Sequence, residues 1–584
     1  MAVRATRQPT SRISQFEPVH LDLISRSRLR ERLWNCLPLG ISLLIVSTIF
    51  WAPFYAPEIL AVSLVAFFAY WLIRSYAVVV ACVVGIFRIR RWKATNWAAK
   101  YCAWLPGHPG AETWDWPRHL VIIPNYRESE EGLSRTLDSL AAQPNRDQLV
   151  VVLAMEARET GCRAKAGRLL MRYRVYFGDM FATYHPAGLP SETPGKGSNE
   201  AWAAREAYRR LIDDGAEDIR RFTVTSCDAD AVFHERHFEA LNYLFLTSKD
   251  RYRAFWQPTI FNSNNIWDIP APLRIPDGLS GVNRLSNLLL PGSVKFPTSC
   301  YSLSWEMLHA IDYWDEEVIP EDWHVYLKSC FTLGDRVHVE PIFLPLGNDC
   351  VLTDRYDKTI RAHYAQQVRH AWGASDIPYA WRFSLNRRSP LSWRRRLVLT
   401  GAVTKVHALW MAQWYIVALG PQIPVLFTRK FGAGMPPWWT TPSISLPGPM
   451  WDFGALFTGH FFEVLEIRWL MLAIVPAMIS VCLLPLLGII ALEYYFRGPR
   501  PEYVRLRHVA WGFAQWPLMA ANTFLLGSVP ALHAQWKLAS GNNLVYRVAE
   551  KGSRRMPHPH LPALGNPAKP QEKVRESMSI GGGQ

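Results

Sequence analysis

Two long apolar segments near the N-terminus place the strongest constraint on how this chain can fold. The first runs from Trp34 to Phe54, and the second runs from Ile59 to Phe87 with Arg74 inside it. About 20 consecutive apolar residues are enough for a helix to cross a bilayer. We therefore predict two transmembrane helices within residues 34–92. We expect Arg74 either to face protein or to mark a helix that extends beyond the membrane.

Basic residues gather at the ends of these segments and account for much of the net charge of +15. They include Arg26, Arg28, Arg30 and Arg32 before the first segment, and Arg88, Arg90, Arg91 and Lys93 after the second. Cytoplasmic flanks of membrane helices are enriched in Lys and Arg, so we place both ends of the hairpin, and residues 1–33, in the cytoplasm. A basic patch can also bind nucleic acid. Because these charges follow the membrane ends, we expect no nucleic-acid partner.

The C-terminal third is apolar again, with candidate spans at 397–427, 470–494 and 509–532. We predict an interfacial helix and about three transmembrane helices within residues 390–535. A polar tail, residues 536–584, follows and is expected to be partly disordered because it is rich in Pro, Gly and charge. The nine cysteines include no Cys-x-x-Cys pair, so neither a disulfide framework nor structural zinc is expected.

The stretch between the two apolar regions has a different pattern. Short apolar runs alternate with amphipathic stretches that have helical periodicity. The runs are 120–123, 149–153 and 222–225, and the helical stretches include 131–142 and 199–212. Near-continuous apolar strands that alternate with helices indicate a parallel sheet covered on both faces. We predict a doubly wound α/β domain over residues 118–380, inserted between N-terminal and C-terminal transmembrane helices.

Ligands of such sheets bind beyond the carboxyl ends of the strands. Asp228 and Asp230 follow the third strand directly, one residue apart. Magnesium and manganese take oxygen ligands, commonly one or two carboxylates together with phosphate oxygens. An Asp-x-Asp triplet is expected about once by chance at ordinary composition. Its position after an apolar strand therefore carries the prediction that Asp228 and Asp230 bind Mg²⁺ or Mn²⁺.

Other residues that follow predicted strands or open the next helix are predicted to bind a nucleotide donor together with Asp228. They are Pro124, Tyr126, Glu128, Glu156 and Lys196. Lys196 precedes a predicted helix, so it either contacts phosphate or is an exposed loop residue. Its surroundings lack the spacing of a P-loop.

Two later segments carry further candidates. Glu321 and Asp322 lie among apolar residues, where a carboxylate could act as a general base. The alternative is an ordinary acidic helix N-terminus. Gln366 and Arg369 are three residues apart and would share a helix face. Arg is suited to stabilising a phosphate leaving group, although the pattern also fits a solvated helix. The predicted acceptor and phosphate set is Gln366, Arg369, His370 and Trp372, with Trp372 as a stacking surface for sugar.

The ordered set of motifs resembles the family 2 glycosyltransferases, particularly the membrane-integrated branch with the cellulose, chitin and hyaluronan synthases. Residues 121–128 resemble the opening strand and loop, Asp228-Ala229-Asp230 resembles D-x-D, 320–322 resembles T-E-D, and 366–370 resembles Q-x-x-R-W. The resemblance implies a cytoplasmic GT-A domain and an inverting transfer from a nucleotide-diphosphate sugar, expected to be a UDP-sugar. It makes Asp322, next to Glu321, the base. Metal on Asp230 and the guanidinium of Arg369 would neutralise the departing diphosphate.

Three positions depart from the family pattern. Glu156 stands where an Asp pair is usual, Pro320 replaces Thr, and His370 replaces Trp. In processive synthases that Trp helps to bind the acceptor, so we expect transfer to a membrane-associated glycan or lipid acceptor without assuming polymer synthesis. A processive polysaccharide synthase with coupled export, a lipid-linked single-sugar transferase, a transporter and a non-catalytic sugar-binding scaffold remain alternatives. The sequence indicates no oligomeric state.

Residues 544–551 faintly resemble the cytoplasmic gating segment of processive synthases. Two helices before the domain and three after it would place this segment outside, whereas its basic residues favour the inside. Either a further segment, such as 453–465, enters the membrane, or one predicted span does not cross.

Overall fold

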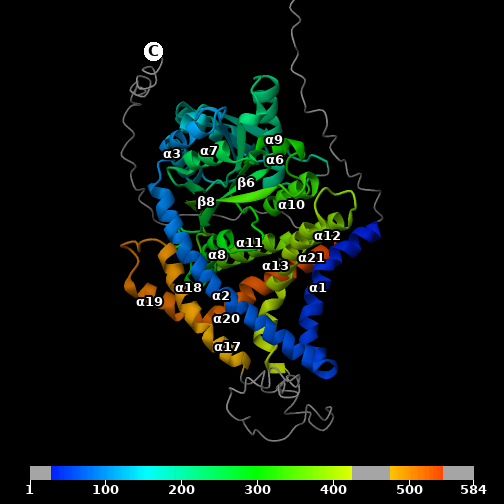
Figure 1. Cartoon of the computed structure of the whole chain (residues 1–584). Helices are drawn as coiled ribbons and strands as arrows, with labels where there is room; N and C mark the ends of the chain where they lie inside the picture. Colours follow the sequence, from blue (N-terminus) through cyan, green and yellow to red (C-terminus); the bar gives the residue numbers. More distant parts are fainter. Residues whose placement is uncertain (1–27, 191, 424–473, 543–584) are drawn as a thin grey trace, which may run out of the picture.

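The computed structural model describes residues 28–190, 192–423 and 474–542. An α/β domain lies above a group of long helices (Figure 1). The suggested gating segment at 544–551, the segment at 453–465 and nearly all of the predicted tail lie outside the described residues.

An eight-stranded sheet forms the centre of the α/β domain, in the order β3-β2-β1-β4-β7-β6-β8-β5. The strands are β1 (Arg118–Asn125), β2 (Leu149–Glu156), β3 (Asp179–His185), β4 (Phe222–Ser226), β5 (Val232–Phe233), β6 (Ala254–Phe261), β7 (Tyr301–Ser304) and β8 (His338–Gly347). The three predicted strands, β1, β2 and β4, are parallel neighbours, as expected. Strand β7 is antiparallel to both β4 and β6, which makes the sheet mixed.

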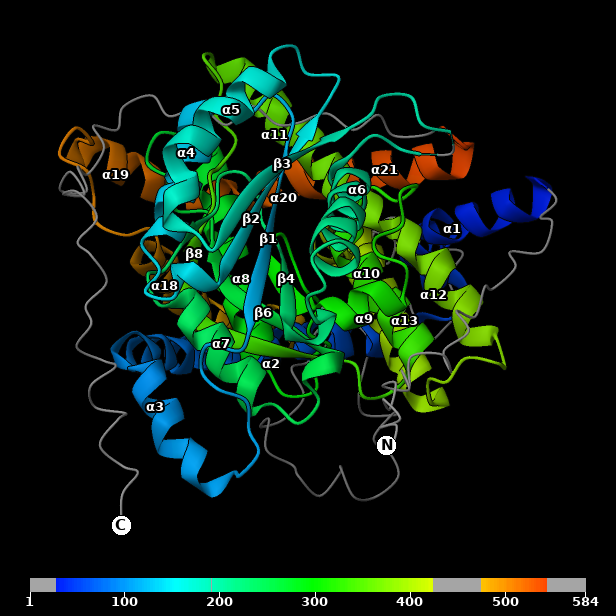
Figure 2. The ribbon, with the colours of Figure 1, turned by 90° about the horizontal axis from the view of Figure 1, so that it is seen from above.

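Helices cover both faces of the sheet because alternate residues of the buried strands point to opposite sides. Leu120 and Ile122 of β1 pack in one hydrophobic cluster, and Val121 and Ile123 pack in the other. The first cluster includes α6 (Lys196–Tyr208), α9 (Trp305–Ala310) and α10 (Glu321–Leu333), and the second includes α4 (Glu130–Ala141), α5 (Cys162–Tyr173) and α7 (His237–Thr247). Figure 2 shows these two sets on either side of β1 and β2. The predicted α/β fold class is confirmed.

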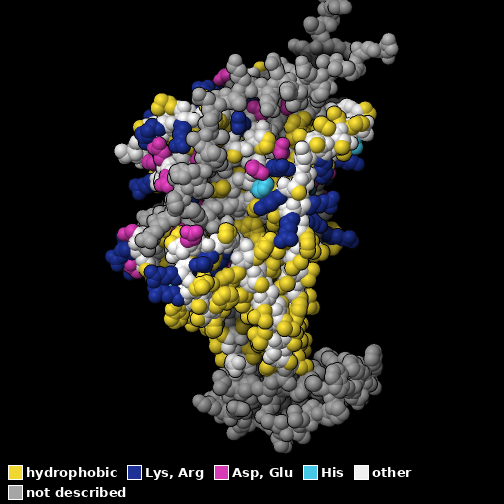
Figure 3. Space-filling model, turned by 90° about the vertical axis from the view of Figure 1, so that its left-hand side faces the viewer, with side chains coloured by type: hydrophobic (Ala, Val, Ile, Leu, Met, Phe, Trp, Pro, Cys, Tyr) yellow, Lys and Arg dark blue, Asp and Glu magenta, His cyan; other side chains and the backbone are white. Residues whose placement is uncertain are grey.

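Three helices in the described residues are long and apolar enough to cross a membrane: Arg30–Tyr55, Ile59–Ala94 and Val475–Phe496. They correspond to α1 (Arg28–Tyr55), α2 (Pro57–Ala94) and the continuous pair α17 (Val475–Val481) and α18 (Leu483–Phe496). On the face shown in Figure 3, hydrophobic side chains cover the lower part of the described residues, and Lys and Arg side chains lie above them. The length and apolar composition of these helices are consistent with a membrane protein.

The other two predicted spans have a different structure. The first corresponds to α13 (Trp393–Leu419), which is not among the three helices above. The stretch 509–532 is broken into α19 (Leu506–Ala514), a 3-10 turn, α20 (Met519–Thr523), a π turn and the start of α21 (Val529–Ser540). Pro517 and Pro530 lie in this stretch, and proline removes a helix hydrogen bond. The number of C-terminal spans stays a prediction, since residues 424–473 lie outside the described part.

Helix α8 (Ala271–Leu289) lies between the sheet and the long helices (Figure 1). It packs against α2, α18 and β6. The guanidinium Nη2 of Arg74 in α2 donates to Oδ1 of Asn287 in α8 at 2.8 Å. Arg74 therefore faces protein, and α2 is also longer than a single bilayer crossing requires, at 38 residues.

Candidate functional site

Asp228 owes its position to the pairing of β4 with β7. The antiparallel register places Ser226 opposite Tyr301, so the next residues bring Cys227 beside Cys300 and Asp228 beside Ser299. The Ser299 hydroxyl donates to Oδ2 of Asp228, and the backbone N–H of Asp228 donates to Sγ of Cys300 at 3.2 Å. Ser299 was not among the predicted site residues.

Lys196, the first residue of α6, lies at the centre of a cluster of carboxylates. Its ammonium Nζ is 2.9 Å from Oδ1 of Asp228 and 2.9 Å from Oε1 of Glu321. It also donates to the carbonyl oxygen of Ser299 at 2.6 Å. Only 11 % of the Lys196 side chain is exposed, so the exposed-loop reading is wrong. Burial lowers the pKa of Lys196, but Asp228, Glu321 and Glu200 outweigh it and hold the pKa well above its usual value.

Asp322 is the second residue of α10 and belongs to the same cluster. Its Oδ2 accepts the backbone N–H of Ser299 at 3.1 Å, and its Oδ1 accepts the backbone N–H of Trp323 at 2.8 Å. Burial, reinforced by the adjacent Glu321, raises the pKa of Asp322 to about 7, although Lys196 and the two N–H groups oppose the rise. Asp322 is therefore both part of a helix N-terminus and a candidate general base.

Asp230 is held by a different set of partners. Its Oδ2 accepts the backbone N–H of Asp349 at 2.7 Å, and 5 % of its surface is exposed. Asp349 lies 2.5 Å from the guanidinium of Arg135 in α4, and Nδ2 of Asn264 donates to it at 2.9 Å. These contacts connect Asp230 to α4 and to the loop after β8.

Glu200 is a second residue that the sequence analysis missed. It follows Lys196 by one helical turn, is fully buried and accepts the Ser226 hydroxyl at 2.6 Å. Burial raises its pKa to about 8, while the nearby Lys196 opposes the rise. The spacing of four residues from Lys196 on a helix could have identified it.

The end of β1 and the loop after it hold three predicted donor-site residues. Pro124 lies within β1, and Oε2 of Glu128 accepts the backbone N–H of Tyr126 at 2.7 Å and Nδ2 of Asn125 at 3.1 Å. Glu128 thus closes the turn of this loop. The guanidinium of Arg158 lies 4.0 Å from the ring centre of Tyr126, a cation–π distance.

Glu156, at the end of β2, is joined to this loop through the same Arg158. Its Oε2 is 3.1 Å from Nε of Arg158 and 3.3 Å from Nδ1 of His185, and 2 % of its surface is exposed. Burial lowers the pKa of His185, but Glu156 and Glu192 outweigh it, so the net pKa is raised. Tyr126, Glu156 and Arg158 therefore form a second polar cluster at the ends of β1 and β2.

Gln366, Arg369 and His370 lie on α11 (Tyr356–Ala371), with Trp372 directly after it. Trp372 is 8 % exposed and packs in a hydrophobic cluster with Ile319, Val368 and residues of α13 and α21. Its ring contributes to packing, which leaves little surface for a sugar. Because Ile319 is two residues before Glu321, the same cluster holds α11 against the segment that carries the carboxylates. His370 is exposed.

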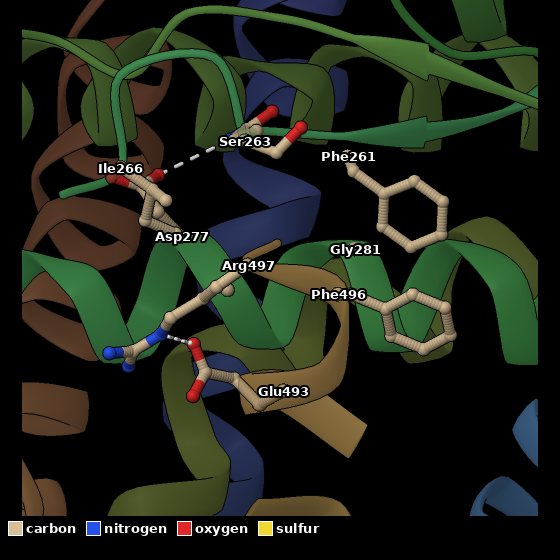
Figure 4. Close-up of a pocket in the computed structure, with 10 residues that line it drawn as sticks. Phe261, Ser263, Ile266, Asp277, Gly281, Glu493, Phe496 and Arg497 are labelled. Atoms are coloured by element: carbon tan, nitrogen blue, oxygen red, sulfur yellow. Dashed lines mark hydrogen bonds and ion pairs between the residues drawn. The ribbon is translucent and has the colours of Figure 1, made fainter. Parts of the chain in front are cut away.

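A small pocket lies between α8 and α18 (Figure 4). It is lined by Asp277, Gly281, Glu493, Phe496 and Arg497 among others, and includes none of the predicted site residues. Glu493 and Arg497 form a buried ion pair within it.

The chain is similar to a family model and to a solved structure. The model of the family described as "Glycosyl transferase family group 2" matches residues 223–524, just over half of the chain. Among solved structures, the chain is similar to a mannosyltransferase from Pyrobaculum calidifontis, PcManGT, in complex with GDP-Man and Mn²⁺. The identity is 14 %, the TM-score is 0.37, and the match covers 74 % of this chain and 99 % of that one. No curated protein matches. The family match, which begins in β4 and includes Asp228, Asp230 and Asp322, shows that the chain belongs to glycosyl transferase family group 2 and is a glycosyltransferase.

Proposed function

We propose that the protein transfers a sugar from a nucleotide-diphosphate sugar, expected to be a UDP-sugar, to a membrane-associated glycan or lipid acceptor with inversion. The observation that carries the proposal is the pair of contacts made by the Lys196 ammonium, at 2.9 Å to both Asp228 and Glu321. These contacts join the predicted donor carboxylate to the residue beside the predicted base. A donor and a base are needed at one centre for a direct displacement.

Asp322 is the proposed general base. A carboxylate with a pKa of about 7 is well matched to accept a proton near neutral pH. Asp322 would take the proton of an acceptor hydroxyl, whose oxygen attacks the anomeric carbon while the bond to the diphosphate breaks on the opposite face. The cations Lys196 and Arg369 would offset the charge that develops on the departing diphosphate.

The carboxylate pair suits a divalent cation only when phosphate oxygens complete its ligands. Among the described residues, no group of three or more His, Cys, Asp or Glu side chains could hold a metal ion by itself. Asp228 and Asp230 supply two carboxylates, the number that Mg²⁺ commonly takes from protein beside substrate phosphates. When bound, the ion would neutralise charge on the diphosphate.

The catalytic domain, residues 118–380, is proposed to face the cytoplasm. Arg88, Arg90, Arg91 and Lys93 are exposed at the end of α2 that leads into the domain, as the positive-inside rule requires. Among the alternatives, His370 favours transfer of a single sugar over processive synthesis, because the family's acceptor-binding Trp is replaced by an exposed imidazole.

The expected result for Asp230→Ala is loss of metal-stimulated release of nucleotide diphosphate. The purified full chain would be incubated with a panel of nucleotide sugars with and without Mn²⁺ or Mg²⁺. Removal of a metal carboxylate should lower turnover by about 100-fold or more. Asp357→Ala, which removes an exposed ion pair with Arg355, is the control. Donor binding without turnover in the wild type would indicate a scaffold, and movement of intact sugar across vesicles would indicate a transporter.

The pH profile of turnover should rise through about pH 7, because Asp322 must lose its proton before it can accept another. Glu321→Gln removes a negative charge that raises the pKa of Asp322, so the acidic limb should move to lower pH. Turnover at saturating donor, measured from pH 5 to 9, tests both statements. If the acidic limb does not move in Glu321→Gln, the limb does not report the ionisation of Asp322.

A further inference from the structure

Ser299 contacts Asp228, Asp322 and Lys196 with three different polar groups. Its hydroxyl donates to Oδ2 of Asp228, its backbone N–H donates to Oδ2 of Asp322 at 3.1 Å, and its carbonyl accepts from Nζ of Lys196 at 2.6 Å. The hydroxyl also accepts from Nδ2 of Asn348 at 2.8 Å. We propose that Ser299 is a positioning residue that sets the donor carboxylate Asp228 and the base Asp322 at a fixed separation. This inference rests on the proposed function.

The backbone of Ser299 adopts a conformation that serine rarely takes. Its φ is +61°, in the left-handed region, where a side chain other than Gly, Asn or Asp is disfavoured. Such a conformation persists only where the surroundings impose it, and it is concentrated at functional sites. Here it accompanies an N–H directed to Asp322 and a carbonyl directed to Lys196.

The surroundings impose this conformation from both sides of Ser299. The backbone N–H of Thr298 donates to Oε1 of Gln257 at 2.7 Å. Nε2 of the same amide donates to the carbonyl oxygens of Thr298 at 3.3 Å and of Cys300 at 3.2 Å. Gln257 lies in β6 and is 3 % exposed, so both neighbours of Ser299 are fixed to the sheet by one buried side chain.

The hydroxyl and the backbone of Ser299 can be tested separately. Ser299→Gly accepts the left-handed backbone and removes the CH2OH side chain with its hydroxyl, while the backbone N–H and carbonyl stay. The charged carboxylate of Asp228 then loses the hydrogen bond that it accepts from the hydroxyl. We therefore expect the KM for the donor to rise about tenfold, while the acidic limb of the pH profile stays unchanged. In Ser299→Val a β-branched residue opposes positive φ. The N–H that lowers the pKa of Asp322 is then displaced, so the acidic limb should move to higher pH and kcat should fall.

Ser302→Ala is the matched control in the same pair of strands. Ser302 is 1 % exposed, and its hydroxyl makes a 2.8 Å hydrogen bond to the Thr225 hydroxyl, three register positions from the pair Asp228 and Ser299. It should lower the thermal midpoint without changing the donor KM or the acidic limb. A wild-type donor KM in Ser299→Gly would overturn the inference, and so would the same kinetic changes in Ser302→Ala. If Ser299→Val does not fold, the result for Ser299→Gly alone decides. If wild type shows no turnover, or Asp322→Asn retains it, the proposed function itself fails.

Discussion

Asp322→Asn is expected to lower sugar transfer by about 100- to 10,000-fold while donor binding is kept, because loss of a general base has an effect of this size. The amide is nearly the same size as the carboxylate, and its oxygen can still accept one of the two backbone N–H groups that bind Asp322. The amide cannot take a proton from the acceptor hydroxyl. Single-turnover transfer and the donor Kd, measured on the purified full chain, separate chemistry from binding.

Asp312→Asn is the control for this experiment. Asp312 lies in the same region of the chain, but its side chain is 76 % exposed and lies 3.4 Å from the guanidinium of Arg205. Its φ is +55°, which Asn tolerates well, so the substitution is structurally mild. The control should transfer sugar as the wild type does. Undiminished transfer by Asp322→Asn would show that Asp322 is not the general base.

Lys196→Met should have the largest effect on stability. It leaves Asp228, Glu321 and Glu200 in a buried site without their shared cation. Removal of one partner from a buried ion pair typically costs about 3–5 kcal/mol, because the other charge stays buried and uncompensated. We expect a lower thermal midpoint in detergent and loss of turnover together.

The cost of Lys196→Met should also depend on pH in a defined direction. The folded pKa of Glu200, already raised to about 8, would rise further without the ammonium. A carboxyl group whose folded pKa exceeds its unfolded pKa lowers stability as pH rises between the two values. The wild type stops losing stability from this group near pH 8, whereas the variant continues to lose it above that pH, so the variant should be closer to the wild type at pH 5 than at pH 9. Lys358→Met, which removes an exposed pair with Asp354, should leave the thermal midpoint close to that of the wild type at either pH. Equal midpoints for the two variants would contradict the central role of Lys196.

Strand ends were the most informative feature of the sequence. Asp228 and Lys196 are 32 positions apart in the chain but follow β4 and β3, respectively, and the carboxyl ends of these parallel strands lie at one edge of the sheet. The antiparallel direction of β7, which makes the sheet mixed, could not be predicted from the sequence. Strand β7 has only four residues, and an apolar pattern carries no information about strand direction.

The limits of prediction are also visible at single residues. Ser299 lies in a loop with no motif, and its left-handed backbone depends on Gln257 from a distant strand. Trp372 resembles a sugar-stacking residue in the sequence, but α13 and α21 bury it. Those contacts form between segments remote in the chain, and local patterns do not reveal them.

The most direct test of the account follows both halves of the reaction in one experiment. The purified full chain in bilayers would receive a nucleotide sugar labelled in the sugar, Mn²⁺ and a membrane lipid or glycan extract. We expect nucleotide diphosphate to be released in a one-to-one ratio with label that appears in the acceptor, and both products to disappear in Asp322→Asn. Label that enters the acceptor equally in the wild type and in Asp322→Asn would contradict this expectation.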